Sequence, residues 1–412
     1  MNQKYATLSA DITIIGAGLV GATLACAIAQ LPQAQSLNII LVEAGSDSHE
    51  FVGENFDPRV VALTQASQQL FERIGIWNEI TNTRACAYRD MHVWDGEGTA
   101  EIHFNASDVR VPQLGHIVES SVIVKHLRNR LSHFSNIQLI QPAKLAELTS
   151  TASQTQVVLD NDIIINTQLL LAADGAHSRV RELAQFETRE WDYNHTAIVT
   201  SVQTELPHQQ TAWQRFMRTG PLAFLPLQIG NTTVNEKQKN FCSIVWSAEP
   251  DLATELMALT DTEFCARLAT AFEHKLGKIL HTAERFAIPL RQRHAKEYIK
   301  PRIALVGDAA HNIHPLAGQG VNLGLLDVAA MVAEIERALT RQLPLNDFSL
   351  LRRYQRARMA GNLSMMAAME TFKRLFASQS LMVTWIRNAG MRQLNSLAEL
   401  KKIIIKSAMG LE

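Results

Sequence analysis

The sequence predicts an α/β protein in which a Rossmann-like dinucleotide-binding domain carries an inserted antiparallel-sheet domain and a C-terminal helical segment. A glycine-rich turn between a short apolar strand and a helix, within residues 11–29, predicts the parallel part. Short strands that alternate with polar turns from about residue 187 to 290 predict the antiparallel part. A chain of 412 residues is long enough for two or three domains.

The first βαβ unit carries the run Gly16-Ala-Gly18-Leu-Val-Gly21, between a strand at 11–15 and a helix at 22–29. Gly16 permits a tight turn, Gly18 lets a pyrophosphate approach the backbone, and Gly21 lets the helix pack closely on the strand. A second strand at 38–42 ends in Glu43, which can accept hydrogen bonds from ribose hydroxyls. A tight turn without a ligand would also use glycine, but this complete context predicts a dinucleotide site.

A second motif follows the apolar stretch at 169–173, which ends in Asp174-Gly175. Ser178 is then placed to cap a short helix. An isolated Asp-Gly pair is most often a hairpin turn. Its position between two other glycine-rich motifs indicates a more specific role.

The third motif is the most informative part of the chain and runs from Gly307 to Asp327. A strand-like stretch at 303–306 delivers Asp308 to a turn, and a glycine-rich loop then opens a helix. A carboxylate at a strand end can bind a ribityl or ribose hydroxyl. Unpaired N–H groups at a helix start can stabilise partial negative charge on a ring system. These are the two requirements of a flavin.

The three motifs occur in the order GxGxxG, DGxxSxVR and GDAAHxxxPxxGQGxNxGxxD. This order resembles the single-component flavoprotein aromatic hydroxylases of the para-hydroxybenzoate hydroxylase type. The segment Asp57-Pro-Arg59-Val-Val-Ala-Leu and the segments 215–226, 272–279 and 400–411 resemble the ubiquinone-biosynthesis branch of that family. Within the branch, the resemblance is greatest to the hydroxylases of 2-polyprenyl-6-methoxyphenol.

The resemblance implies an FAD-dependent monooxygenase that takes electrons from NAD(P)H and hydroxylates a prenylated phenol with O2. Such enzymes form a C4a-hydroperoxyflavin, because ground-state dioxygen cannot insert into the ring directly. A second GxGxxG does not follow a strand-like segment later in the chain. We therefore expect no separate NAD(P)H domain, and the resemblance implies a transient surface groove instead.

The resemblance also implies individual site residues. Pro315 would place its carbonyl near the hydroxylated carbon, and Gly318, Gln319 and Gly320 would face the pyrimidine edge of the flavin. Arg59 would lie against the flavin, although a surface ion pair is an alternative, and Glu119 is a flavin contact or a residue of a solvated face. The residues expected to bind FAD are Gly16, Gly18, Gly21, Glu43, Arg59, Arg128, Asp174, Gly307, Asp308, Gly318, Gly320 and Asn322.

Metal, nucleic-acid and membrane-spanning functions are not indicated. His311 and His314 lack a third ligand nearby, so hydrogen-bonded packing is the better interpretation of both. The four cysteines are scattered, and a net charge of −1 gives no electrostatic case for nucleic acid. Neither a signal peptide nor an apolar run of about 18 residues is evident. We expect a cytoplasmic protein.

The substrate is expected to need an apolar pocket that opens to a surface. Candidates to line it, which plain sheet core explains equally well, are Phe216, Leu222, Phe224, Leu225 and Leu227. Between Thr371 and Leu411 there are seven Lys or Arg residues against one acid, Glu399. This bias suggests a peripheral contact with anionic lipid at the inner membrane face, or with a quinone-biosynthesis protein complex, and a solvated helical face is an equal alternative.

The segments 1–75, 116–186 and 291–345 are expected to form the FAD-binding domain, 76–115 and 187–290 the substrate domain, and 346–412 the C-terminal helical segment. Within them we expect helices at 121–133 and 261–275 and a hairpin at 94–98. Three other functions stay open: a sibling hydroxylase acting at another ring carbon, a hydroxylase of a small soluble phenol, and a structural subunit with vestigial flavin sites. A flavin halogenase is disfavoured, because no Trp-x-Trp-x-Ile-Pro stretch follows the first domain.

Overall fold

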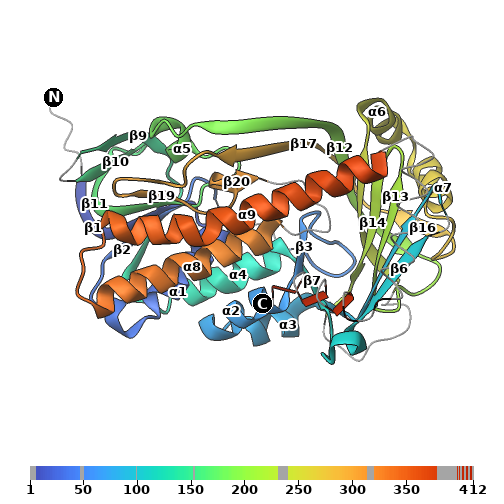
Figure 1. The fold of residues 1–412 in the computed structure, drawn as a ribbon, viewed down its shortest axis with the longest axis horizontal. Coiled ribbons are helices and arrows are strands. Elements are labelled where there is room, and N and C mark those ends of the chain that lie inside the picture. Colours follow the sequence, from blue (N-terminus) through green and yellow to red (C-terminus); the bar gives the residue numbers. More distant parts are fainter. Residues whose placement is uncertain are drawn as a thin grey trace.

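Two large sheets, a small third sheet and the helices around them make up the protein (Figure 1). The computed structural model describes residues 6–46, 51–98, 100–151, 154–230, 240–312 and 320–377, with 397, 399, 401, 402, 405, 406, 409 and 410 near the C-terminus.

The first sheet is mostly parallel. Its strands run in the order β18 (Ile299–Lys300), β19 (Ile303–Leu305), β11 (Ile163–Ala172), β1 (Ala6–Ile15), β2 (Ile39–Val42) and β8 (Ile137–Ile140). Strands β9 (Leu145–Ser150) and β10 (Thr155–Leu159) extend β11 as an antiparallel meander. Strands β19, β11, β1, β2 and β8 are parallel to one another. Their carboxyl ends therefore meet at one edge of the sheet.

Helices cover this sheet and bury it. Helix α1 (Leu19–Ala29) contacts both α4 (Ser120–Leu131) and α8 (Gly320–Thr340). All four residues of β2 are buried, as expected for a strand with both faces covered. The largest apolar cluster of the described residues lies here, and it includes Ile12, Ile14, Leu24 and Leu41 at 0% exposure.

The second sheet is mostly antiparallel and lies beside the first (Figure 1). Its order is β20 (His311–Asn312), β17 (Phe286–Ala295), β12 (Thr188–Thr204), β15 (Phe241–Ala248), β14 (Gly220–Leu227), β13 (Thr211–Met217), β5 (Asp90–Asp95) and β6 (Glu101–Asn105), with β16 (Ile279–Thr282) beside β12. Helices α6 (Pro250–Ala258) and α7 (Asp261–Ala271) cover one face. Thr260 and Glu263 form a capping box at the start of α7.

A small third sheet and the last long helix connect the two parts. Strand β7 (Gly115–Glu119) pairs antiparallel with β3 (Val60–Leu63) and β4 (Ala85–Tyr88). Helices α2 (Gln65–Ile74), α3 (Trp77–Arg84) and α5 (Arg179–Leu183) are shorter, and 3-10 turns lie at Pro32–Ala34, Ala106–Val109 and Gly307–Ala309. Helix α9 (Phe348–Ala377) runs along α8 and contacts both β18 and β13 (Figure 1).

The predicted fold class is confirmed, with two local differences. The expected helix at 121–133 and the hairpin at 94–98 are present as α4 and as the β5–β6 turn. Helix α7 ends at Ala271, four residues before the predicted end, because Glu273 and His274 adopt positive φ angles of 55° and 53°. Helix α6 was not predicted, although Pro250 in its first turn is a common start signal.

Among the residues that the structure describes, no helix combines the length and the apolar character needed to cross a membrane.

Candidate flavin site

The carboxyl edge of the parallel sheet brings the first two motifs into contact. The Gly16 N–H donates to the Val42 carbonyl at 2.8 Å, and the Ala173 N–H donates to the Ile15 carbonyl at 2.8 Å. Gly16 has a φ of 97°, and a Cβ there would lie 2.4 Å from the Ala173 oxygen. A Cβ on Gly21 would lie 1.8 Å from the Gly16 oxygen. The geometry therefore requires glycine at both positions.

The turn leaves open space where a dinucleotide would approach. A Cβ on Gly18 would meet no atom within 4 Å, and the N–H groups of the first turn of α1 lack intrahelical partners. The two oxygens of Glu43 accept from the N–H groups of Ala17 (2.6 Å) and Gly45 (2.8 Å). Each carboxylate oxygen retains a lone pair for a ribose hydroxyl. These residues fit the adenosine diphosphate half of FAD.

Asp174 lies beside this turn. Its Oδ2 accepts from the N–H groups of Arg179 (2.8 Å) and Val180 (3.1 Å) at the start of α5, and Ser178 caps the same helix, as predicted. Its Oδ1 is buried and has no hydrogen-bond partner among the described residues. Burial raises the pKa of Asp174, which the hydrogen bonds at α5 partly offset. The unsatisfied oxygen is an acceptor that a donor group of a bound ligand would satisfy.

The third motif is fixed to the second by a buried arginine. Arg181 is 7% exposed and donates to the carbonyls of Ala309 (2.9 Å) and Ala176 (2.8 Å). Gly307 has a φ of 63°, which glycine adopts without strain. The Asp308 side chain that follows is exposed. A carboxylate at a strand end is therefore presented to solvent beside the dinucleotide turn.

The start of α8 gives a mixed result for the predicted residues. Gly320 opens the helix, and a Cβ there would meet no atom within 4 Å. The Asn322 side chain donates to the Ala62 carbonyl at 2.7 Å and accepts from the Thr64 N–H at 3.1 Å and the Ser67 hydroxyl at 2.7 Å. Its side chain thus fastens α8 to the β3–α2 junction. Pro315, Gly318, Gln319 and His314 lie outside the described residues.

Glu119 does not lie on a solvated face, and that interpretation was wrong. Its side chain is 3% exposed, and its Oε2 lies 2.9 Å from Nε of Arg84, which is 7% exposed. Its Oε1 accepts from the Asp57 N–H at 2.7 Å. Burial raises the pKa of Glu119 to about 7, although the Arg84 guanidinium acts in the opposite direction.

This buried pair shapes the segment that carries Arg59. The Asp57 carboxylate accepts from the N–H groups of Arg59 (2.9 Å) and Ser121 (3.0 Å), which joins the segment to the start of α4. The Arg59 side chain is 77% exposed, with Nε 3.7 Å from Asp57 Oδ1. Arg128 is half-buried in the last turn of α4. Sequence reasoning missed Arg84, for which the sequence holds no local signal, whereas Asp57 is the first residue of a recognised segment.

His311 is confirmed as a packed, hydrogen-bonded residue. It is 1% exposed, and its Nε2 lies 2.5 Å from Oδ2 of Asp327. No group of three or more metal-ligating side chains occurs within the described ranges. Asp327, the last residue of the third motif, is 0% exposed and was also missed as a structural residue.

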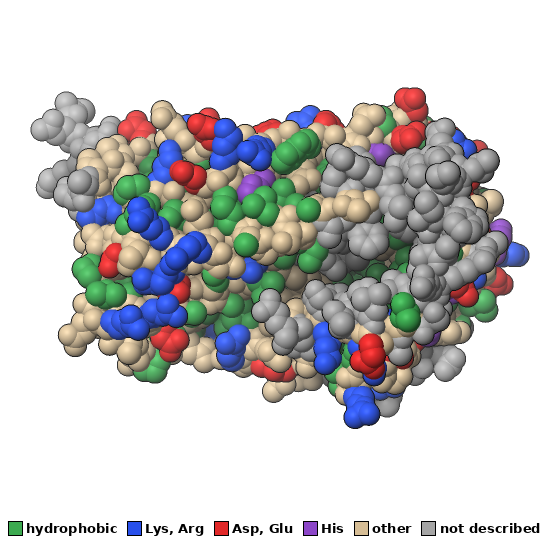
Figure 2. All heavy atoms as spheres, in the orientation of Figure 1, with side chains coloured by type: hydrophobic (Ala, Val, Ile, Leu, Met, Phe, Trp, Pro, Cys, Tyr) green, Lys and Arg blue, Asp and Glu red, His purple; other side chains and the backbone are tan. Residues whose placement is uncertain are grey.

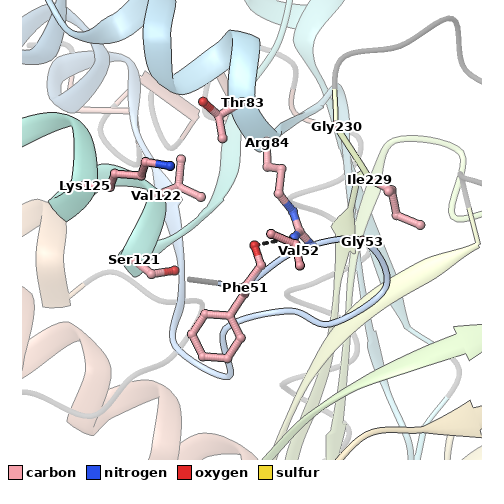
Figure 3. A pocket seen from close by; sticks show the side chains of 10 residues that line it. All are labelled: Phe51, Val52, Gly53, Thr83, Arg84, Ser121, Val122, Lys125, Ile229 and Gly230. Atoms are coloured by element: carbon pink, nitrogen blue, oxygen red, sulfur yellow. Dashed lines mark hydrogen bonds between the residues drawn. The ribbon is translucent and has the colours of Figure 1, made fainter. Parts of the chain in front are cut away.

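A pocket of about 240 Å³ lies between residues 51–53, the end of α3, the start of α4 and residues 229–230 just after β14 (Figure 3). Apolar side chains of Phe51, Val52, Val122 and Ile229 line it together with Thr83, Arg84, Ser121, Lys125, Gly53 and Gly230. Ligand pockets usually measure about 300–1,000 Å³. This pocket is therefore large enough for only a part of a ligand.

Four of the five predicted pocket residues lie on β14 and alternate between its two faces, whereas Phe216 lies on β13. Leu222 and Phe224 are 0% exposed and belong to the cluster under α6 and α7, so the sheet-core interpretation holds for them. Leu225 and Leu227 face the other side, where they contact the cluster of Phe56 and the third sheet. Phe216 packs against Ala100 and Ile102 instead. Of the five, Leu225 and Leu227 are thus the two that lie toward Phe56 and the third sheet.

Comparisons with known proteins agree with this geometry. A family model described as an FAD binding domain matches residues 9–368. The chain is 33% identical to a 3-demethoxyubiquinol 3-hydroxylase of Escherichia coli, over 97% of this chain and 98% of that protein. It is 31% identical to the mitochondrial ubiquinone biosynthesis monooxygenase COQ6 of Xenopus tropicalis, over 97% and 93%. The crystal structure of the p-nitrophenol 4-monooxygenase PnpA of Pseudomonas putida shares the fold, with a TM-score of 0.77 at 16% identity over 99% of both chains.

The family model covers most of the chain, and the relatives are matched over nearly their whole length. The protein is therefore a flavoprotein monooxygenase that uses FAD. The chain belongs to the FAD-dependent hydroxylases of ubiquinone biosynthesis.

Proposed function

We propose that the protein hydroxylates 2-polyprenyl-6-methoxyphenol with NAD(P)H and O2. The observation that supports this most is the meeting of three motifs at one sheet edge, with open space at Gly18 and an unsatisfied Asp174 oxygen beside it. The segments that resemble the 2-polyprenyl-6-methoxyphenol branch support the choice of substrate.

FAD held here would supply the activation of dioxygen. In the proposed site, the turn from Gly16 to Gly21 and Glu43 hold the adenosine diphosphate, and Asp308 holds the ribityl chain. Gly318, Gln319 and Gly320 stabilise charge on the pyrimidine edge, and Pro315 orients the phenol. Further contacts come from Arg59, Arg128, Asp174, Gly307 and Asn322. The segments 1–75, 116–186 and 291–345 form this FAD-binding domain, and 76–115 with 187–290 form the substrate domain.

A second candidate is hydroxylation at another ring carbon. The E. coli relative is named for a 3-hydroxylation of a demethoxyubiquinol, which favours this alternative. The test is a mass-spectrometric quinone profile of a strain that lacks this gene, with and without the restored chain. Accumulation of 2-polyprenyl-6-methoxyphenol that complementation reverses supports the first proposal. Accumulation of a different prenylated intermediate supports the second, and an unchanged profile contradicts both.

Replacing Asp308 with alanine should lower the FAD content of the purified protein. One lost hydrogen bond to a charged group corresponds to roughly a tenfold or greater loss of FAD affinity. Because the side chain is exposed, the melting temperature of the apoprotein should not change. Fluorescence titration of the apoprotein with FAD measures the affinity. Full FAD content in the variant would exclude Asp308 from the site.

We propose a peripheral membrane contact for the basic C-terminal region, in a protein that otherwise works in the cytoplasm. Lys and Arg side chains also lie on the face where α8 and α9 run (Figure 2). Arg352 and Arg356 of α9, and Arg341 just after α8, are exposed. Among the tail residues that the structure describes, Lys401 pairs with Asp108 at 3.1 Å and Lys402 with Glu399 at 2.7 Å.

Anionic vesicles should therefore carry the protein upward in a flotation assay, and neutral vesicles should not. Binding should weaken as salt is raised, because the attraction is electrostatic. Absence of flotation with anionic vesicles at low salt would contradict the contact and leave a protein complex or a solvated helical face as the explanation of the basic residues.

A further inference from the structure

A buried carboxylate lies directly behind the turn that presents Asp308. Asp327 on α8 is 0% exposed, and its Oδ2 accepts from the Gly307 N–H at 3.0 Å and lies 2.5 Å from His311 Nε2. Because an ionised carboxylate can only accept, the histidine donates through Nε2. Asp327 thus holds the backbone N–H directly before Asp308 and the side chain of His311 after it.

The turn is also confined by close packing. A Cβ on Gly324, one helical turn before Asp327 on the same face of α8, would lie 2.9 Å from Val20 on α1 and 3.4 Å from the Gly307 Cα. The turn is therefore held between α1 and α8, and the Asp327 carboxylate holds its N–H from the side of α8. A small movement of this carboxylate would move the turn.

The cation that holds Asp327 comes from a different part of the chain. Arg358 on α9 has a side chain 13% exposed, and its Nε donates to Asp327 Oδ1 at 2.8 Å. Its Nη2 donates to Asn362 Oδ1 at 2.9 Å, and Asn362 donates to the Tyr298 hydroxyl at 3.2 Å. Tyr354, also on α9, donates to the Leu305 carbonyl at 2.8 Å, at the end of the strand that leads into the turn.

We propose that Arg358 is a positioning residue of the flavin site: through the buried carboxylate of Asp327 it fixes the Gly307–Asp308 turn against FAD. This inference rests on the proposed function, in which that turn binds FAD. Helix α9 is then a part of the flavin site, although it follows the three motifs. Its contact with β13 of the second sheet also places the substrate side and the flavin turn on one rigid element.

The electrostatics of the cluster agree with this role. Burial alone would raise the pKa of Asp327, but His311 and Arg358 outweigh it and hold the pKa below its ordinary value. The carboxylate is therefore ionised whenever the protein is folded near neutral pH. Without Arg358 the buried carboxylate would keep His311 but lose its guanidinium partner, so it would take up a proton more readily or shift toward another donor. Either change alters the acceptor of the Gly307 N–H.

The experiment compares Arg358→Met with Arg353→Met. Arg353 is a matched control, because it also reaches from α9 to an acid on α8, with Nε 2.6 Å from Glu334 Oε2, but Glu334 does not contact the turn in the described structure. The measurements are FAD affinity of the apoprotein, the visible spectrum of the bound flavin and the melting temperature of the apoprotein. We expect Arg358→Met to weaken FAD binding about tenfold and to shift the flavin spectrum. Arg353→Met should stay within about a factor of two of the unmodified protein.

Equal FAD affinity of Arg358→Met and the unmodified protein would overturn the inference. So would an equal loss in Arg353→Met, because the effect would then be general docking of α9. If the methionine variant does not fold, Arg358→Lys against Arg353→Lys repeats the comparison with milder changes and the same criteria. Asp308→Ala distinguishes failure of the proposed FAD site from failure of the Arg358 inference. Full FAD content in Asp308→Ala refutes the proposed site. Loss of FAD from Asp308→Ala with normal FAD binding in Arg358→Met refutes only the role of Arg358.

Discussion

Replacing Gly21 with alanine is expected to unfold the first turn of the flavin domain and to abolish FAD binding. The added Cβ would lie 1.8 Å from the Gly16 oxygen and 3.0 Å from its carbonyl carbon. Neither atom can move freely, because Gly16 N–H is bonded to Val42 and its Cα faces Ala173. Helix α1 must then separate from β1. Overpacking of this kind costs about 3 kcal/mol or more of unfolding free energy when backbone is the obstacle.

Gly18→Ala is the matched control three residues earlier. Its Cβ would meet no atom within 4 Å, and the φ of −69° suits any residue. The stability of the apoprotein should therefore change by no more than about 1 kcal/mol, because the entropy gained by restricting the unfolded chain offsets the poorer N-cap of α1. FAD affinity should nevertheless fall, because the open space is where the pyrophosphate is proposed to lie.

Urea unfolding of the two apoproteins and titration with FAD make the comparison. Normal stability in Gly21→Ala would show that α1 can move away from the turn at little cost. Normal FAD affinity in Gly18→Ala would place the pyrophosphate elsewhere. The Gly21→Ala result tests the packing of α1, and the Gly18→Ala result tests where the ligand binds.

Local glycine spacing explains why so much of the fold was predictable. Gly16 and Gly307 adopt positive φ angles in the turn after a strand, and Gly21 lets the following helix pack against that turn. Short-range requirements leave a pattern in neighbouring residues, so β1, α1, β2, β19 and α8 could be predicted from sequence. The C-terminal end of α7 and the existence of α6 depended on turn geometry in the second sheet, and these were the less accurate predictions.

Contacts between distant segments left no such pattern. Asp327 is part of the third motif in the sequence, but its partner Arg358 lies 31 residues further along, on a helix that carries no motif. Asn322 was visible too, but sequence gave no sign that Ala62, Thr64 and Ser67 would occupy its side chain. Only the tertiary structure distinguishes a polar residue that is available to a ligand from one that the fold already uses.

Arg84→Met is the second large effect that we expect, and it should depend on pH. Glu119 is 2% exposed, and removal of its only cation within 4 Å among the described residues leaves a buried charge. Breaking a buried pair in this way costs about 3–5 kcal/mol when the remaining group is ionised. A proton on Glu119 removes most of that cost, so the destabilisation should be larger at pH 8.5 than at pH 5.5.

The sign follows from the direction of the pKa shift. In the unmodified protein, burial raises the Glu119 pKa from 4.5 to about 7 in spite of Arg84. The folded state therefore binds more protons, and the stability contributed by this group is full below about pH 4.5 and is lost as the pH rises through about 7. Arg84→Met removes the attraction that lowers the Glu119 pKa, so the loss of stability with rising pH should be greater and should extend to higher pH. Glu119→Gln should flatten the profile in both backgrounds, because the titrating group is gone.

Arg285→Met provides the control for everything except the buried charge. Arg84 lies over the Phe56 ring at 4.2 Å and donates to the carbonyls of Phe51 and Asn55. Arg285 makes the same kinds of contact: it lies over the Phe264 ring at 5.0 Å and donates to the carbonyls of Leu256 and Leu259. Its acidic partner Asp261, however, has a side chain that is 73% exposed. Urea midpoints of the apoproteins should therefore fall by a similar amount at pH 5.5 and 8.5 for Arg285→Met. A pH-independent loss in Arg84→Met as well would mean that packing and hydrogen bonds, and not the charge on Glu119, account for the contribution of Arg84.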